Sequence, residues 1–118
     1  MKTILIVDDR PDFANLLANL LRGEDSEIDT AYSVRAAKQK MDLKKYGYAM
    51  IDWYMPDGID LDIIEDIAGD PEVKFLLLTG SPNRIIEDTV QLYGGKYLQK
   101  TDANLLNELK RFLEDSFN

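Results

Sequence analysis

Short apolar runs alternate with amphipathic helical patterns along this chain, and this alternation restricts the possible folds more than any other feature. Residues 3–7 (Thr-Ile-Leu-Ile-Val) form a continuous apolar run, as in strands buried on both faces. Further strands are expected at the apolar segments 48–51 and 74–78 and at the more mixed segments 27–32 and 96–99. The pattern predicts an α/β fold of the (βα)₅ type: a doubly wound, five-stranded parallel sheet in flavodoxin-like order 2-1-3-4-5, with one domain over residues 1–118.

Local signals mark where several of the helices begin. Ser33 is a good N-cap for a helix over residues 33–45, because its hydroxyl can accept a hydrogen bond from a free backbone N–H. Ser81 followed by Pro82 predicts another helix start, with a hydroxyl cap and a proline in the first turn.

The composition excludes several classes of protein. The chain has no Cys and no His, which removes thiol chemistry, Ser-His catalysis and His-zinc sites. It has 14 Lys plus Arg against 22 Asp plus Glu, so its net charge of -8 argues against direct binding of nucleic acid. No apolar stretch is long enough for a signal peptide or a membrane span, so we expect a cytoplasmic protein without membrane contact.

Polar side chains follow four of the five expected strands. Asp8 and Asp9 come after the first strand, Asp52 after the third, Thr79 after the fourth and Lys100 after the fifth. The carboxyl ends of parallel strands meet at one edge of the sheet, where such folds bind their ligands. The sequence therefore predicts that three carboxylates, a hydroxyl and an ammonium group converge there.

Such a cluster needs a cation or a proton. Two carboxylates ~4 Å apart repel each other by roughly 4 kcal/mol at an effective dielectric constant near 20. A sparse set of oxygen ligands with retained waters favours Mg²⁺ over Ca²⁺. A magnesium ion beside a carboxylate, a hydroxyl and a lysine suits phosphoryl transfer, and an ionised carboxylate can be the nucleophile without a histidine to activate it.

Four motifs at these positions resemble those of response-regulator receiver domains, in the family's order and spacing. They are Val7-Asp8-Asp9, Ile51-Asp52-Trp53-Tyr54-Met55-Pro56, Leu78-Thr79-Gly80 and Tyr97-Leu98-Gln99-Lys100. The resemblance implies a switch protein of two-component or phosphorelay signalling that promotes its own phosphorylation and dephosphorylation but is not a turnover enzyme.

The resemblance also implies a role for each matching acid. Asp52 matches the phosphoacceptor, which becomes an aspartyl phosphate. Asp9 and Asp52 would bind Mg²⁺ directly together with the backbone carbonyl of Tyr54, while Asp8 would act largely through water.

The remaining matches imply how the signal is passed on. Lys100 would pair with the phosphoryl oxygens, and Thr79 would move its hydroxyl toward them. Tyr97 matches the switch aromatic, which turns inward when that threonine moves. A histidine kinase or phosphotransfer protein would supply the phosphoryl group. A downstream partner would read the face formed by the fourth helix, the fifth strand and the fifth helix, and a second copy of the chain is another candidate partner.

One departure from the family pattern lies beside the lysine. Thr101 follows Lys100 where receivers usually carry a proline with a cis peptide bond. A cis bond before a non-proline residue costs about 2.5–4 kcal/mol, so the sequence leaves open whether this bond is cis or trans.

Two alternatives stay open at this point. The chain could be a receiver-like binding module that works without phosphorylation. It could also be a phosphatase resembling haloacid dehalogenases, although those carry an acid two residues after the nucleophile, where this chain has Arg10 after Asp8. The printed sequence ends with the last expected helix, and it leaves open whether the chain acts alone or comes from a larger regulator.

Overall fold

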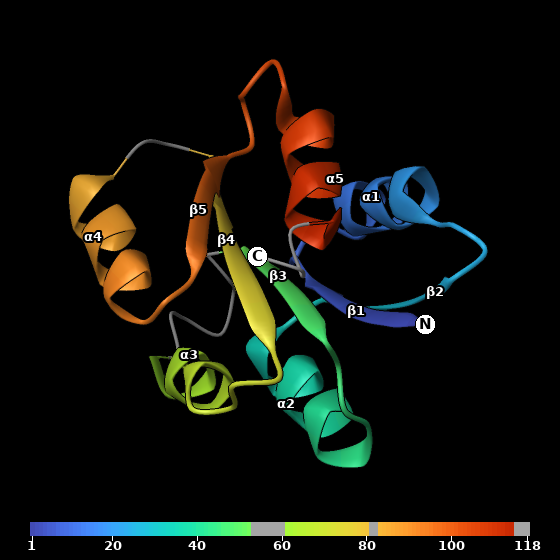
Figure 1. Cartoon of the computed structure of the whole chain (residues 1–118), viewed down its shortest axis with the longest axis horizontal. Coiled ribbons are helices and arrows are strands. Elements are labelled where there is room, and N and C mark those ends of the chain that lie inside the picture. The colour runs from blue at the N-terminus through green and yellow to red at the C-terminus, as the bar shows by residue number, and fades with distance from the viewer. Residues whose placement is uncertain (53–60, 81–82, 115–118) are drawn as a thin grey trace.

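The computed structural model describes residues 1–52, 61–80 and 83–114, in which strands and helices alternate (Figure 1). The strands are β1 (Lys2–Val7), β2 (Ser26–Ala31), β3 (Tyr48–Asp52), β4 (Lys74–Thr79) and β5 (Lys96–Gln99). The helices are α1 (Pro11–Leu21), α2 (Val34–Leu43), α3 (Leu61–Ala68), α4 (Arg84–Leu92) and α5 (Leu105–Glu114). All neighbouring strands are parallel and their order is β2-β1-β3-β4-β5, which confirms the predicted flavodoxin-like sheet.

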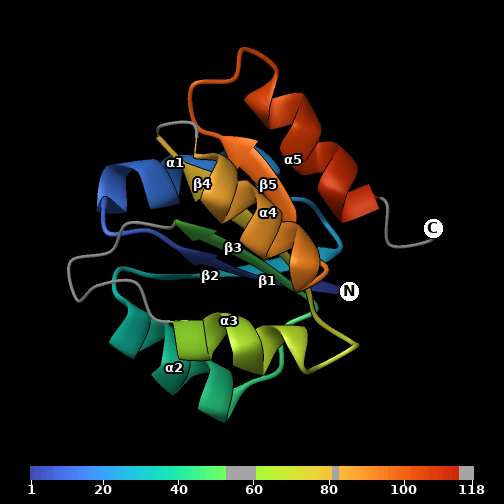
Figure 2. The same cartoon turned by 90° about the vertical axis from the view of Figure 1, so that its left-hand side faces the viewer.

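Two apolar layers hold the helices against the sheet. Successive strand residues point to opposite faces, so Leu5 and Val7 pack with α2, α3 and α4 while Ile4 and Ile6 pack with α1 and α5. The two cartoon views show these two groups of helices on opposite faces of the sheet (Figures 1 and 2). All four of these β1 residues are buried. Helices on both faces explain why the central strands are apolar throughout rather than alternating with polar residues.

Of the two helix starts predicted from the sequence, the structure confirms one and differs at the other. The Ser33 hydroxyl accepts a hydrogen bond from the backbone N–H of Ala36 at 3.0 Å, as predicted for α2. The predicted start of α4 at Ser81 was wrong, because the helix begins at Arg84 and Asn83 is its cap. The Asn83 side chain accepts hydrogen bonds from two backbone N–H groups of the first turn, which an asparagine does as well as a serine.

A polar network joins β2 to the loop before β3. The Tyr46 hydroxyl donates a hydrogen bond to Asp29 at 2.6 Å, and the Lys44 ammonium contacts the same carboxylate at 3.1 Å and pairs with Glu27. The hydrogen bond from Tyr46, with Lys44 adding to it, holds the pKa of Asp29 below its usual value. Burial and the same hydrogen bond raise the pKa of the Tyr46 hydroxyl.

Replacing Tyr46 by phenylalanine is expected to lower the free energy of unfolding by about 1 kcal/mol at neutral pH. The ionised Asp29 is stabilised in the folded protein, so its contribution is present above the unfolded aspartate pKa of about 3.9. The contribution is lost as the pH falls through the lower folded value, so the difference between the variant and the wild type should shrink there. Urea unfolding between neutral and acidic pH measures this difference.

Tyr48→Phe is the matched control. The Tyr48 hydroxyl donates to the backbone carbonyl of Leu113 at 3.2 Å, and a carbonyl does not titrate in this range. The loss in Tyr48→Phe should therefore be the same at every pH, and a Tyr46→Phe loss equally independent of pH would contradict the role assigned to Asp29.

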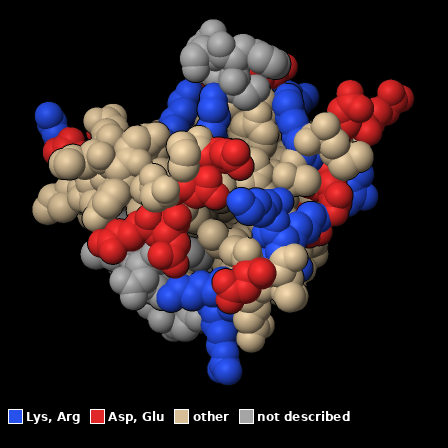
Figure 3. Space-filling model, turned by 60° about the horizontal axis from the view of Figure 1, so that its bottom comes forward, with Lys and Arg blue, Asp and Glu red and all other residues tan. Residues whose placement is uncertain are grey.

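Charged side chains of both signs are spread over the surface. Figure 3 shows Lys and Arg beside Asp and Glu on the described part of the face that it presents. Within the described ranges of the chain, no helix has the length and apolar character needed to cross a bilayer.

Candidate functional site

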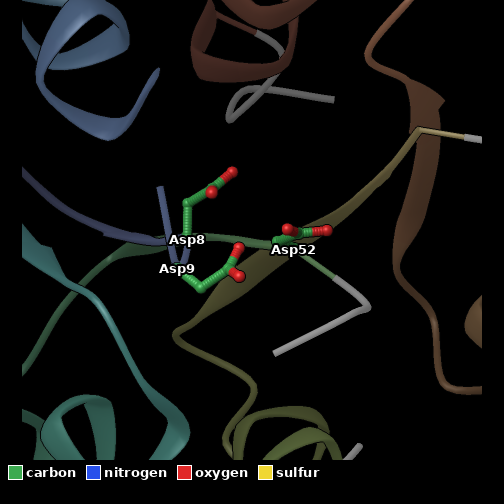
Figure 4. A group of neighbouring side chains, drawn as sticks. All are labelled: Asp8, Asp9 and Asp52. Carbon is green, nitrogen blue, oxygen red and sulfur yellow. The ribbon is translucent and has the colours of Figure 1, made fainter. Parts of the chain in front are cut away.

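The carboxyl ends of β1 and β3 bring three acids to one edge of the sheet. Asp52 is the last residue of β3, and Asp8 and Asp9 follow β1 directly. Val7 and Ile51 are partners in the parallel ladder, so the next residues, Asp8 and Asp52, emerge side by side. Oxygens of all three carboxylates lie within 4.8 Å of one another (Figure 4).

This edge is the point at which the strand order reverses. The chain moves from β1 to β2 on one side and then to β3 on the other, so the helices that follow β1 and β3 lie on opposite faces of the sheet. Doubly wound folds bind their ligands at such a switch point, outside the carboxyl ends of the strands.

Burial makes the acid cluster costly without a cation. Asp8 is 1% exposed and Asp52 is 6% exposed, while Asp9 lies at the surface. Buried carboxylates must be paired or hydrogen-bonded to remain ionised. The backbone N–H of Arg10 donates to Asp8 Oδ1 at 2.9 Å, which stabilises and orients that carboxylate.

Lys100 supplies a positive charge to two of the acids. Its Nζ lies 2.7 Å from Asp8 Oδ2 and 3.1 Å from Asp52 Oδ2, and its side chain is 16% exposed. Its backbone N–H donates to the carbonyl oxygen of Thr79 at 2.8 Å, which anchors the chain after β5 beside the end of β4.

The net charge of the site side chains favours the binding of a divalent cation. Asp8, Asp9 and Asp52 carry three negative charges when ionised and Lys100 carries one positive charge, so these four side chains have a net charge of two negative units. Within the described part of the chain, the buried Asp8 Oδ2 also has no hydrogen bond of acceptable geometry, although Lys100 is close. The donor set therefore fits a hard divalent ion with oxygen ligands.

Thr79 and Tyr97 lie on the two strands beyond β3. Thr79 is fully buried at the end of β4, next to the end of β3, because Asp52 pairs with Leu78 in the ladder. Tyr97 is half-buried on β5 and packs against the layer formed with α2, α3 and α4. Its hydroxyl accepts a hydrogen bond from the backbone N–H of Asn83 at 3.1 Å, which connects β5 to the start of α4.

The peptide bond after Lys100 is trans, because no cis peptide bond occurs among the residues that the structure describes. This answers the question that Thr101 left open. The Lys100 ammonium reaches Asp8 and Asp52 from this trans segment.

For two residues, the expected site and the described site differ. Tyr54, expected to offer its backbone carbonyl, lies outside the described residues. Phe13 begins a series of apolar residues at helical spacing, Phe13, Leu16, Leu17, Leu20 and Leu21, and its ring centroid lies 4.5 Å from Lys100 Nζ. Helical spacing could identify Phe13 as a core-facing residue but could not show which group it meets.

The fold and the site together define a flavodoxin-like α/β domain with an acidic site at its topological switch point. The model of the response regulator receiver domain family matches residues 4–110, and the chain belongs to this family. Receiver domains are signalling domains of two-component response regulators rather than turnover enzymes.

Similar proteins and structures agree with this family. The acid tolerance regulatory protein ActR of Rhizobium meliloti (strain 1021) is 34% identical over 83 residues, which are 70% of this chain and 43% of that protein. The photosynthetic apparatus regulatory protein RegA of Rhodovulum sulfidophilum is 32% identical over 79 residues, 66% of this chain and 43% of that protein. The chain thus spans less than half the length of these relatives.

Two solved response regulators have the same fold as this chain at low sequence identity. A two-component response regulator from Clostridium difficile has a TM-score of 0.84 at 22% identity, with 100% of both chains covered. The response regulator TrrA from Thermotoga maritima, solved in complex with Mg²⁺-BeF, has a TM-score of 0.76 at 28% identity and covers 95% of this chain and 99% of its own.

Proposed function

We propose that this receiver accepts a phosphoryl group on Asp52 in a reaction that depends on Mg²⁺. One observation carries the proposal: three carboxylates lie within 4.8 Å of one another, and the ammonium of Lys100 contacts two of them. Such a cluster combines a nucleophile with the positive charge that a phosphoryl group needs.

The metal would be held by Asp8, Asp9 and Asp52, with the backbone carbonyl of Tyr54 as a further ligand that only the family resemblance implies. The net charge of the four site side chains supports a divalent cation, and so does the buried Asp8 Oδ2, which has an ion pair with Lys100 but no hydrogen bond of acceptable geometry. The complex of TrrA with Mg²⁺-BeF supports the choice of Mg²⁺. When bound, the ion would neutralise negative charge on the transferred phosphoryl oxygens.

The transfer itself needs little beyond position and charge. An oxygen of Asp52 gives an electron pair to the phosphorus, and the bond from phosphorus to the donor breaks, with its electron pair leaving on the donor. Because Asp52 reacts as a carboxylate, no proton has to be removed from it. Lys100 would move from its contact with Asp52 Oδ2 to the phosphoryl oxygens, since both are anionic and adjacent.

Thr79 and Tyr97 would pass the change to the surface. Thr79 is buried beside Asp52, where its hydroxyl can turn toward a phosphoryl group. Tyr97 contacts the start of α4 through Asn83, so a movement of Tyr97 would be felt by that helix.

The partners that we propose follow from this arrangement. A histidine kinase or a phosphotransfer protein would supply the phosphoryl group in the cytoplasm, and a downstream partner or a second copy of this chain would bind the face formed by α4, β5 and α5. Two large apolar side chains of α4 support a binding surface there, because Ile85 is 78% exposed and Leu92 is 86% exposed.

Intact mass spectrometry tests the proposal directly. The wild-type protein incubated with a small phosphodonor and Mg²⁺ should gain one phosphoryl group, and the adduct should be labile at alkaline pH, as expected for an acyl phosphate. A chelator should suppress the gain. No adduct at any Mg²⁺ concentration would favour a phosphorylation-independent binding module, and steady hydrolysis of a phosphomonoester would favour a phosphatase.

A further inference from the structure

Phe13 contacts the site lysine through its aromatic ring. It lies in the first turn of α1, and its ring centroid is 4.5 Å from Lys100 Nζ. A cation within about 6 Å of an aromatic centroid is attracted by the ring, and the attraction is stronger where water is excluded. Only 16% of the Lys100 side chain is exposed, so little water competes at this contact.

We propose that Phe13 is a positioning residue that holds the Lys100 ammonium where it can reach both Asp8 and Asp52. A lysine side chain is long and loses about 2 kcal/mol of rotamer entropy when it is held in one place. The two carboxylates attract it, and the ring limits where it can settle. This inference rests on the proposed function, because Lys100 matters to phosphoryl transfer only if Asp52 is the acceptor.

One short segment supplies both kinds of contact. Asp8 follows β1 directly, the backbone N–H of Arg10 orients its carboxylate, and α1 begins at Pro11. The same helix turn then places the ring of Phe13 near the ammonium that Asp8 attracts. The Asp8 carboxylate and the Phe13 ring, which both contact the Lys100 ammonium, are therefore held by one continuous segment of the chain.

Core packing is the simpler explanation for Phe13. The residue is partly buried and packs against the layer formed by α1 and α5, where an aliphatic side chain would also fit. Only an aromatic ring attracts a cation through its face, so the two explanations differ for Phe13→Leu and Phe13→Tyr.

The first test compares labelling rates with a small phosphodonor and Mg²⁺. Phe13→Leu should slow the reaction about fivefold, and Phe13→Tyr should stay close to the wild type. In a Lys100→Met background, Phe13→Leu should have no further effect, because the ring then has no cation to position. Ile28→Val, a change in the same apolar layer on β2, controls for general loosening of the core.

The second test does not depend on activity. In the unphosphorylated protein, ring currents from Phe13 should shift the ε-methylene proton resonances of Lys100 upfield in NMR spectra of the wild type and Phe13→Tyr but not of Phe13→Leu. Unshifted resonances in the wild type, or an equal slowing by Phe13→Leu with and without Lys100, would overturn the inference. If the wild type is never labelled, the proposed function fails and the NMR shifts still decide the role of Phe13.

Discussion

Replacing Asp52 by asparagine is expected to reduce phosphodonor-dependent labelling to background while the protein stays folded. An amide oxygen is a poor nucleophile, so the O–P bond cannot form at this position. The change keeps the size of a side chain that is only 6% exposed, so packing at the end of β3 should persist.

The stability of Asp52→Asn should change little, because two effects oppose each other. The variant loses the contact of Lys100 Nζ with Asp52 Oδ2, although the contact with Asp8 remains. It also loses carboxylate repulsion, which at ~4 Å separation is roughly 4 kcal/mol at an effective dielectric constant near 20, a size similar to that of the lost attraction. Intact mass and urea unfolding, measured on the same samples, check both expectations.

Asp12→Asn is the matched control for Asp52→Asn. Asp12 lies in the first turn of α1, near the site in sequence, but its side chain is exposed. The same chemical change there should leave labelling at the wild-type rate. An Asp52→Asn protein that is labelled as fast as Asp12→Asn would place the acceptor on another residue.

Replacing Lys100 by methionine is expected to lower the free energy of unfolding by about 3 kcal/mol in a buffer with chelator. Methionine keeps much of the side-chain volume, but Asp8 and Asp52 then remain buried without their nearest cation. Breaking a buried ion pair by removing one partner costs more than the pair itself contributes, because the remaining charge is left uncompensated.

Magnesium should restore part of this loss. A cation that binds the acids of the folded protein stabilises that state by mass action and also replaces the missing positive charge. Urea unfolding with chelator and then with a series of Mg²⁺ concentrations should show a larger gain in stability for Lys100→Met than for the wild type.

Lys96→Met is the control for Lys100→Met, because it also removes a lysine from this part of the chain but leaves the buried acids with their cation. Lys96 lies on β5, its side chain is 38% exposed, and it pairs with Glu108 at 3.8 Å. An exposed pair at this distance contributes about 0–1 kcal/mol, and Mg²⁺ should not affect the variant differently from the wild type. Equal losses in Lys96→Met and Lys100→Met would show that Lys100 does not compensate buried acids.

Much of the fold could be predicted from local patterns. The run at residues 3–7 carries apolar side chains on both sides of the strand, because helices cover β1 on both faces of the sheet. This pattern is visible in the sequence without coordinates. The parallel order also follows from alternating strands and helices, since right-handed crossovers leave few other topologies. The positions of Asp8 and Asp52 at strand ends then place them at one edge.

The start of α4 shows the limit of such local signals. Ser81 and Asn83 can both cap a helix, and the choice depends on where the helix packs. The backbone N–H of Asn83 donates to the hydroxyl of Tyr97, a contact across two elements that favours the later start. No pattern within the segment itself encodes that contact.

The sequence by itself determined the parallel sheet, the helices between its strands and the gathering of acids at the carboxyl edge, because periodicity and strand direction act over whole elements. Only the tertiary structure decided that Lys100 bridges Asp8 and Asp52 and that Phe13 faces its ammonium. These contacts join the ends of β1, β3, β5 and α1. They depend on helix placement and side-chain rotamers to within about 1 Å, which the spacing of residues along the chain does not record.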